Sequence, residues 1–149
     1  MIEVSSVIRD IKKAFQTTEA YAVYAACMYE PTYEKFIQKT TPMLADPNTR
    51  VYGFFQGELL LGIIAVHRTG GDTAEIKGIA VRETHRRRRI GSGLIAYAMQ
   101  HERLKALSAE TDDDGVLFYR HCGFETEAFV KTFDGMPCRR YRCILGAKQ

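Results

Sequence analysis

The chain has 149 residues, a length typical of one domain, so we expect a single domain over residues 1–149. Hydrophobic residues make up 46% and charged residues 26%, the balance of an ordinary globular protein, which excludes wholesale disorder. The longest apolar stretch, Leu59–Val66, has only the length of a strand, so we expect no membrane span. The first residues, Met1-Ile2-Glu3-Val4, lack a basic region followed by an apolar one, so we expect no secretory leader.

The four cysteines are too few and too scattered for a disulfide scaffold, and no two of them form a C-x-x-C pair. They are Cys27, Cys122, Cys138 and Cys143. We therefore expect a reducing cytoplasm, with the cysteines as buried thiols. The four histidines share no ligand spacing with nearby cysteines or carboxylates, so we expect no bound metal.

The net charge of +3 is too small to indicate a nucleic-acid-binding protein. The charges are clustered, however: Arg86–Arg89 follow His85 directly, and Asp112–Asp114 form a compact acidic run. Runs of this kind usually form a solvated surface. On charge alone we expect no nucleic-acid partner.

The region from about Val7 to Ala45 is predicted to be helical. Apolar residues recur there at helical spacing: Val7, Ile8, Ile11 and Phe15 in a first segment, and Tyr33, Phe36 and Ile37 in a second. The pair Asp46-Pro47 closes the region as a loop.

Three strands are expected next. Val51–Phe55 and Leu59–His67 flank a short connection that contains Gly57, which is typical of an antiparallel hairpin. After a glycine turn, Ala74–Val81 forms the third strand of this meander.

The rest of the chain alternates between helices and strands. A helix with one apolar stripe begins at Ile90, and a short strand within Leu104–Glu110 is expected to run parallel to Ala74–Val81, because a helix of crossover length separates the two strands. A second helix, Gly115–Cys122, is predicted to be capped by Asp112 or Asp113 and ended by Gly123.

Ala128–Phe133 and Arg139–Leu145 alternate around a glycine turn and predict a closing hairpin. The fold class is therefore α/β, with a mixed, mostly antiparallel sheet flanked by helices.

The stretch Arg88–Gly93 lies between a strand and a helix and contains two glycines. Glycine lets the backbone turn sharply and approach a ligand closely, and the first N–H groups of a helix attract phosphate. Neighbouring arginines add charge and bidentate donors. The stretch therefore favours a phosphate-bearing ligand, with a solvated glycine turn as the open alternative.

The same glycines also match a dinucleotide-binding fingerprint, Gly91-x-Gly93-x-x-Ala96, with Glu110 near the place of the ribose-binding acid. That fingerprint places its first glycine directly at the strand end, whereas nine residues, Arg82–Ile90, intervene here. It also expects parallel strands, whereas an antiparallel meander precedes this loop. A nicotinamide site is therefore disfavoured.

Two motifs resemble a known family. Ile79-Ala80-Val81 followed by the R-x-x-G-x-G stretch Arg88–Gly93 resembles motif A of the GNAT superfamily of acetyl-CoA-dependent N-acetyltransferases. Phe118–Phe124, which follows Ala109–Asp112, resembles motif B of that family, F-Y-x-x-x-G-F. Together they span Glu75–Phe124, about a third of the chain. The order of expected helices and strands is similar to a GNAT fold.

The resemblance implies acetyl-CoA as co-substrate and no metal. Backbone groups of Ile79, Ala80 and Val81 would bind the pantetheine arm. A loop would cradle the pyrophosphate, formed by Arg87, Arg88, Arg89, Ile90, Gly91, Ser92 and Gly93. Many members carry an asparagine shortly before motif B, whereas this chain has Thr111–Asp114, so whether residues 111–114 contact the cofactor stays open.

Three residues are candidates for catalysis. By the resemblance, Tyr119 lies near the thioester sulfur, and its phenol, with an ordinary pKa of about 10, could protonate the departing thiolate. Glu75 opens a strand that resembles the one on which some members carry a catalytic glutamate. Glu110 ends the adjoining strand and is the competing base. The alternative for Tyr119 is an aromatic residue of the core without a catalytic role. The alternative for Glu75 and Glu110 is a solvated carboxylate at the end of a strand.

The predicted function is direct transfer of the acetyl group of acetyl-CoA to a primary amine of a small-molecule or peptide acceptor, which makes the protein an acyltransferase. We expect Tyr21–Phe36 to line the acceptor side. Two alternatives stay open: a non-catalytic acetyl-CoA-binding module, and a domain whose basic loop binds RNA or a partner's acidic surface. A homodimer is common in families of this type, and the sequence leaves the oligomeric state open.

Overall fold

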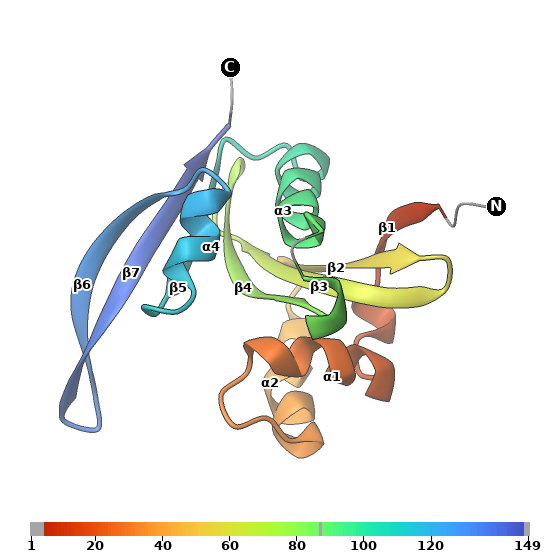
Figure 1. Cartoon of the computed structure of the whole chain (residues 1–149), viewed down its shortest axis with the longest axis horizontal. Coiled ribbons are helices and arrows are strands. Elements are labelled where there is room, and N and C mark those ends of the chain that lie inside the picture. Colours follow the sequence, from red (N-terminus) through yellow and green to blue (C-terminus); the bar gives the residue numbers. More distant parts are fainter. Residues whose placement is uncertain (1–4, 87, 148–149) are drawn as a thin grey trace.

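A computed structural model of the chain describes residues 5–86 and 88–147. Its seven strands form one sheet in the order β1-β2-β3-β4-β5-β7-β6 (Figure 1). The helices and strands are β1 (Ser6–Asp10), α1 (Thr18–Tyr24), α2 (Tyr33–Ala45), β2 (Thr49–Gln56), β3 (Leu59–Arg68), β4 (Thr73–Val81), α3 (Ile90–His101), β5 (Ala106–Thr111), α4 (Val116–His121), β6 (Glu125–Phe133) and β7 (Met136–Gly146). The sheet is mostly antiparallel, so the expected fold class is confirmed.

The first segment of the chain is a strand, and the prediction of a helix from Val7 is wrong. β1 pairs antiparallel with β2, from Ser6 opposite Gln56 to Asp10 opposite Tyr52. The helical spacing of the apolar residues has a different cause, because Ile11 and Phe15 are buried in the core on either side of a 3₁₀ turn that follows β1. A short edge strand of mostly exposed residues has too little buried surface to impose a two-residue period on its sequence.

The second predicted segment, which carries Tyr33, Phe36 and Ile37, is confirmed as α2, and α1 also lies within the region predicted to be helical; a threonine caps each of these two helices. The side chain of Thr17 accepts a hydrogen bond from the backbone N–H of Ala20, and that of Thr32 accepts one from Lys35. These caps satisfy N–H groups that have no partner inside the helix. Acidic residues in the first turns, Glu19 and Glu34, add a favourable interaction with the helix dipole.

Helices cover both faces of the sheet (Figure 1). α1 and α2 pack on one face through a core that includes Phe15, Tyr24 and Phe36. α3 and α4 pack on the other face, where Leu94 and Tyr119 belong to the second core. The central strand β3 is buried over most of its length because both of its faces are covered.

The centre of the sheet opens where β4 and β5 stop pairing. These strands are parallel, as predicted, but pair only from Thr73 opposite Ala106 to Glu75 opposite Ser108. On its other side β4 continues to pair with β3 as far as Val81, with an irregularity at which Lys77 has no opposite residue. β5 instead pairs onward with β7, and the β6–β7 hairpin curves away from β2–β4 (Figure 1). Beyond Glu75, one edge of β4 therefore has no strand partner among residues 5–86 and 88–147.

The start of α4 differs from the prediction. Its N-cap is Gly115, which offers no side chain, and Asp112 instead accepts hydrogen bonds from the backbone N–H groups of Asp114 and Gly115 in the preceding turn. Asp113 bonds to Arg139 and Tyr141 on β7. The end of α4 is as expected, because Gly123 has a φ of +92°, which favours glycine.

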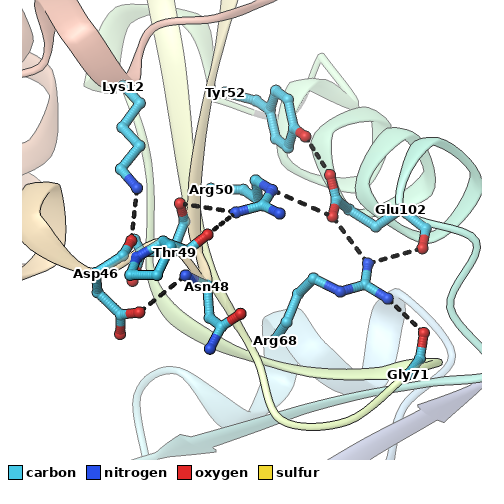
Figure 2. A network of polar contacts seen from close by, with 10 residues as sticks. Lys12, Asp46, Asn48, Thr49, Arg50, Tyr52, Arg68, Gly71 and Glu102 are labelled. Atoms are coloured by element: carbon cyan, nitrogen blue, oxygen red, sulfur yellow. Dashed lines mark hydrogen bonds and ion pairs between the residues drawn. The ribbon is translucent and has the colours of Figure 1, made fainter.

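A polar network ties the end of α3 to β2 and β3 (Figure 2). The Glu102 carboxylate accepts a hydrogen bond from the Tyr52 hydroxyl and lies 2.9 Å from Arg68 Nη1 and 3.6 Å from Arg50 Nε. Burial acts to raise the pKa of Glu102, but the hydrogen bonds from Tyr52 and Arg68 and the charge of Arg50 outweigh it and lower the pKa.

In the described part of the chain, no helix is both long and apolar enough to cross a membrane. The four cysteines are free thiols; Cys143 is buried as expected and Cys122 partly so, whereas the expectation of burial is wrong for Cys27 and Cys138, which are exposed.

Candidate active site

The N-terminus of α3 lies just beyond the free end of β4. A 3₁₀ turn, Glu83–His85, leads from β4 toward α3, and Arg89 is the N-cap with a left-handed φ of 60° and no side-chain cap. Among residues 5–86 and 88–147, the backbone N–H groups of Ile90 and Ser92 have no acceptor. Unpaired N–H groups at the positive end of a helix dipole form a site for a phosphate group.

The two glycines of this loop have different surroundings. A Cβ on Gly91 would come within 2.8 Å of the Phe118 ring, so the absence of a side chain at Gly91 lets α3 pack against α4. A Cβ on Gly93 would meet no atom within 4 Å. The open surface at Gly93 is therefore the part of the loop that a ligand can approach closely.

Exposed cations flank this helix end. Arg88 and Arg89 are exposed, and neither forms an ion pair with another described residue. Arg87, which the sequence also assigns to this loop, lies outside the described residues. The Ser92 hydroxyl donates to the backbone carbonyl of Arg89 at 3.2 Å. The loop thus combines free N–H groups with guanidinium groups, the donors that suit a pyrophosphate.

The free edge of β4 leads from this loop toward the middle of the sheet. Ile79, Ala80 and Val81 pair with β3 on one side, and on the other side no described strand pairs with them. Unpaired backbone groups at a strand edge can hydrogen-bond an extended ligand as an added strand would. This edge is where the sequence places the pantetheine arm.

Tyr119 lies on α4 and is buried, with 7% of its surface exposed. Its ring packs edge-on against Phe124, with the ring centroids 5.1 Å apart. Burial raises the pKa of Tyr119 above its ordinary value, and the nearby Cys143, Cys27 and Cys122 act in the same direction. The hydroxyl is therefore protonated, and no hydrogen bond joins it to any described residue.

A second buried tyrosine, Tyr24, falls within Tyr21–Phe36, the segment expected to line the acceptor side, but the sequence analysis did not single it out as a site residue. Tyr24 on α1 is fully buried, and its hydroxyl has no hydrogen-bond partner in the described part of the chain. A Cβ on Gly78 would lie 2.0 Å from this hydroxyl, so the tyrosine packs directly on the irregular part of β4. The glycine inside the strand pattern was the signal, since such a glycine indicates a close approach of other atoms to the backbone.

Cys27, in the turn that follows α1, was also missed as a site residue. Its thiol donates to the Tyr24 carbonyl at 3.2 Å and lies beside the backbone of Ile79. Burial of the thiol raises its pKa to about 11, although the residue as a whole is exposed. Cys27 influences the pKa of Tyr24 and of Tyr119, so the three side chains lie near one another.

The two candidate bases, Glu75 and Glu110, line one groove of about 570 Å³ between α2 and the sheet. Glu75 lies 3.0 Å from Lys77, and 42% of its side chain is exposed. Glu110 lies 3.2 Å from Arg140 and 3.4 Å from Lys131. The structure thus brings the two carboxylates together on the face covered by α2, whereas Tyr119 comes from the opposite face.

In the ranges that the structure describes, no three or more His, Cys, Asp or Glu side chains are grouped as metal ligands would be.

A family model of the acetyltransferase (GNAT) domain matches residues 47–126, more than half of the chain. The chain belongs to the GNAT acetyltransferase family. The resemblance seen in the two sequence motifs is therefore confirmed. A curated relative, the uncharacterized N-acetyltransferase YvbK of Bacillus subtilis (strain 168), is 28% identical over 126 residues, which cover 65% of this chain and 80% of the relative.

Solved structures share the fold at low identity. A Bacillus subtilis acetyltransferase in complex with CoA has a TM-score of 0.70 at 18% identity and covers 97% of this chain and 100% of its own. A putative GNAT acetyltransferase of Desulfovibrio desulfuricans has a TM-score of 0.75 at 16% identity, with 95% and 99% covered. A GNAT acetyltransferase of Elizabethkingia anophelis, with acetyl-CoA bound, has a TM-score of 0.66 at 18% identity, with 95% and 98% covered.

Proposed function

We propose that this GNAT protein transfers the acetyl group of acetyl-CoA directly to a primary amine of an acceptor. The observation that carries the proposal is the unpaired edge of β4, which runs from the uncapped N-terminus of α3 toward the buried, unpaired hydroxyl of Tyr24 and the neighbouring Tyr119. CoA and acetyl-CoA in two proteins of the same fold support the choice of co-substrate.

In this proposal the cofactor lies along β4. Its pyrophosphate binds the free N–H groups at the start of α3, beside Gly93, and pairs with Arg88 and Arg89; Arg87 is assigned to the same role. The pantetheine arm follows the unpaired edge of Ile79–Val81. The thioester then lies near the irregularity of β4, close to Tyr119.

The reaction requires one new bond, one broken bond and two proton movements. The neutral amine attacks the thioester carbonyl carbon, the C–N bond forms, and the C–S bond breaks. Tyr119 gives its proton to the departing thiolate, and a carboxylate accepts a proton from the amine nitrogen, directly or through water. The products are the acetylated amine and CoA.

Glu75 is the favoured base of the two carboxylates. Glu110 is held by two cations, Lys131 and Arg140, which compete with an amine for its carboxylate. Glu75 has one partner, Lys77, and lies on β4 itself, three residues before the glycine that contacts Tyr24.

A cytoplasmic location belongs to the same proposal and is supported by the four free thiols.

The test is to incubate the protein with acetyl-CoA and a panel of primary amines and to measure release of the CoA thiol together with the mass of the acetylated product. We expect stoichiometric formation of both products with at least one class of amine. Tight acetyl-CoA binding in calorimetry without transfer to any amine would instead indicate a non-catalytic binding module. Salt-sensitive RNA binding without turnover would favour the basic-loop alternative.

A further inference from the structure

The groove between α2 and the sheet carries both signs of charge. Its carboxylates are Asp46, Glu75 and Glu110, and its cations are Lys39, Lys77 and Arg140. A groove suited to a polyamine would have an excess of carboxylates, because each ammonium of the ligand needs a counter-charge. The charges here are instead balanced between the two signs.

The carboxylates of the groove already have partners within the protein. Asp46 lies 3.1 Å from His67, Glu75 lies 3.0 Å from Lys77, and Glu110 lies 3.2 Å from Arg140. A polycation would have to displace these partners and would gain little net Coulomb energy. One ammonium group, in contrast, needs only one carboxylate.

Lys39 is the cation of the groove that is open to a ligand. It is exposed on α2, and no ion pair joins it to another residue in the described ranges. Lys39 lines the same groove as Glu75, the favoured base, so a ligand in this groove can contact both side chains.

We propose that the acceptor is an α-amino acid, whose carboxylate binds Lys39 and whose amine faces Glu75. This inference rests on the proposed function and names its substrate class. A free cation and a candidate base in one groove favour an acceptor that carries an anionic group beside its amine, and in an α-amino acid one carbon separates them. The apolar lining from Pro42, Met43 and Ile76 is suited to contact the side chain of the amino acid.

The experiment compares matched acceptors. Each common L-amino acid is assayed beside its carboxamide and its decarboxylated amine, with spermidine in the same series, and kcat/KM is measured from CoA release. We expect the best amino acid to exceed its carboxamide by about tenfold or more. Conversion of the carboxylate to the carboxamide lowers the pKa of the neighbouring amine and leaves more of it neutral, so amine reactivity alone would favour the carboxamide over the amino acid.

Lys39→Gln separates recognition of the carboxylate from transfer itself. We expect kcat/KM for the amino acid to fall about tenfold through KM, while kcat/KM for the carboxamide is unchanged. Lys35→Gln is the matched control on the same helix, because Lys35 bonds to the Glu30 carbonyl and does not line the groove, and it should leave both values unchanged.

Two results overturn the inference while leaving the proposed function intact. One is acetylation of spermidine or of simple amines at rates equal to or above those of every amino acid. The other is a preference for the carboxylate that persists in Lys39→Gln. Absence of transfer to every amine in the series would overturn the proposed function and this inference together.

Discussion

Tyr24 and Tyr119 are two buried tyrosines that approach the opening of the sheet from opposite faces, and the buried hydroxyl of Tyr24 has no hydrogen-bond partner among the described residues. A buried hydroxyl without a partner destabilises a fold by about 1–3 kcal/mol, so a ligand that hydrogen-bonds to Tyr24 would recover this cost. Both tyrosines have raised pKa values, chiefly because of burial, so both hydroxyls can act as donors at neutral pH. Tyr119 also lies in the motif of the family, which favours it as the acid.

Tyr119→Phe tests that role. The substitution removes one oxygen and keeps the ring that packs against Phe124, so we expect acetyl-CoA affinity and folding to be retained. If proton donation is its role, kcat should fall by about 10²–10⁴-fold. Steady-state kinetics and calorimetry on the same preparation measure both quantities. A variant with full kcat would assign Tyr119 to the core alone.

The choice between the two carboxylates can be tested by the pH dependence of kcat/KM. An amine acceptor is mostly protonated at neutral pH, so the rate rises with pH until free amine and base are both available. Glu75→Gln cannot accept the proton, so we expect the largest loss at low pH and partial recovery at high pH, where the amine is neutral without help.

Glu110→Gln is the control, because its partners Lys131 and Arg140 differ from the single partner of Glu75. Should Glu110→Gln show the pH-dependent loss while Glu75→Gln behaves like the wild type, the base is Glu110. An unchanged profile in both variants would mean that solvent takes the proton.

At the scale of helices and strands, sequence reasoning succeeded where the local pattern and the tertiary contacts agree. The meander β2–β3–β4 and the parallel strand β5 follow from runs of apolar residues between glycine turns, and both are confirmed. The prediction for β1 was wrong because a five-residue edge strand is specified by its partner β2 rather than by its own sequence pattern. The predicted cap of α4 was wrong because the Asp112 side chain accepts hydrogen bonds from backbone N–H groups of the turn that precedes the helix.

Substitutions of Gly91 and Gly93, the two glycines in the first turn of α3, are expected to have different effects. Gly93→Val adds a side chain where the structure has open space, so we expect a folded protein that has lost acetyl-CoA affinity by at least tenfold. Gly91→Val instead forces a side chain into the Phe118 ring, and we expect destabilisation by about 1–3 kcal/mol.

Calorimetry with acetyl-CoA and thermal unfolding separate these two effects. Unchanged acetyl-CoA affinity in folded Gly93→Val would remove the pyrophosphate from this loop. Unchanged stability of Gly91→Val would show that α3 and α4 can move apart without cost.

At the scale of the whole molecule, the candidate site combines residues that are local in sequence with residues that are not. The loop Arg88–Gly93 and Tyr119 lie in motifs, so the sequence alone can predict them. Tyr24, Cys27 and Lys39 come from the N-terminal third and reach the site only because α1 and α2 pack across the open centre of the sheet. Nothing in their own spacing indicates this contact, which depends on the tertiary fold.

The network around Glu102 makes the stability of the whole fold depend on pH. It joins the end of α3 to β2 and β3, and the Glu102 side chain is only 8% exposed. Since the folded state lowers the pKa of this carboxyl below its ordinary value of 4.5, the unfolded state binds the proton more readily. The stabilisation is therefore fully present above about pH 4.5 and is lost as the pH falls through the lower, folded pKa.

Glu102→Gln keeps the size of the side chain but removes the charge that faces Arg50 and Arg68. We expect the free energy of unfolding at pH 7 to fall by about 1–3 kcal/mol, with a lower Tm by about 2–4 °C for each kcal/mol. Urea unfolding at a series of pH values measures the difference from the wild type, which should begin to shrink below about pH 4.5, where the carboxyl of the unfolded state takes up a proton, and be lost below the lower, folded pKa. Glu58→Gln is the control, since Glu58 is exposed and forms no ion pair in the described ranges. A difference for Glu102→Gln that stays constant down to pH 3 would mean that shape and hydrogen bonding, rather than charge, hold α3 to the sheet.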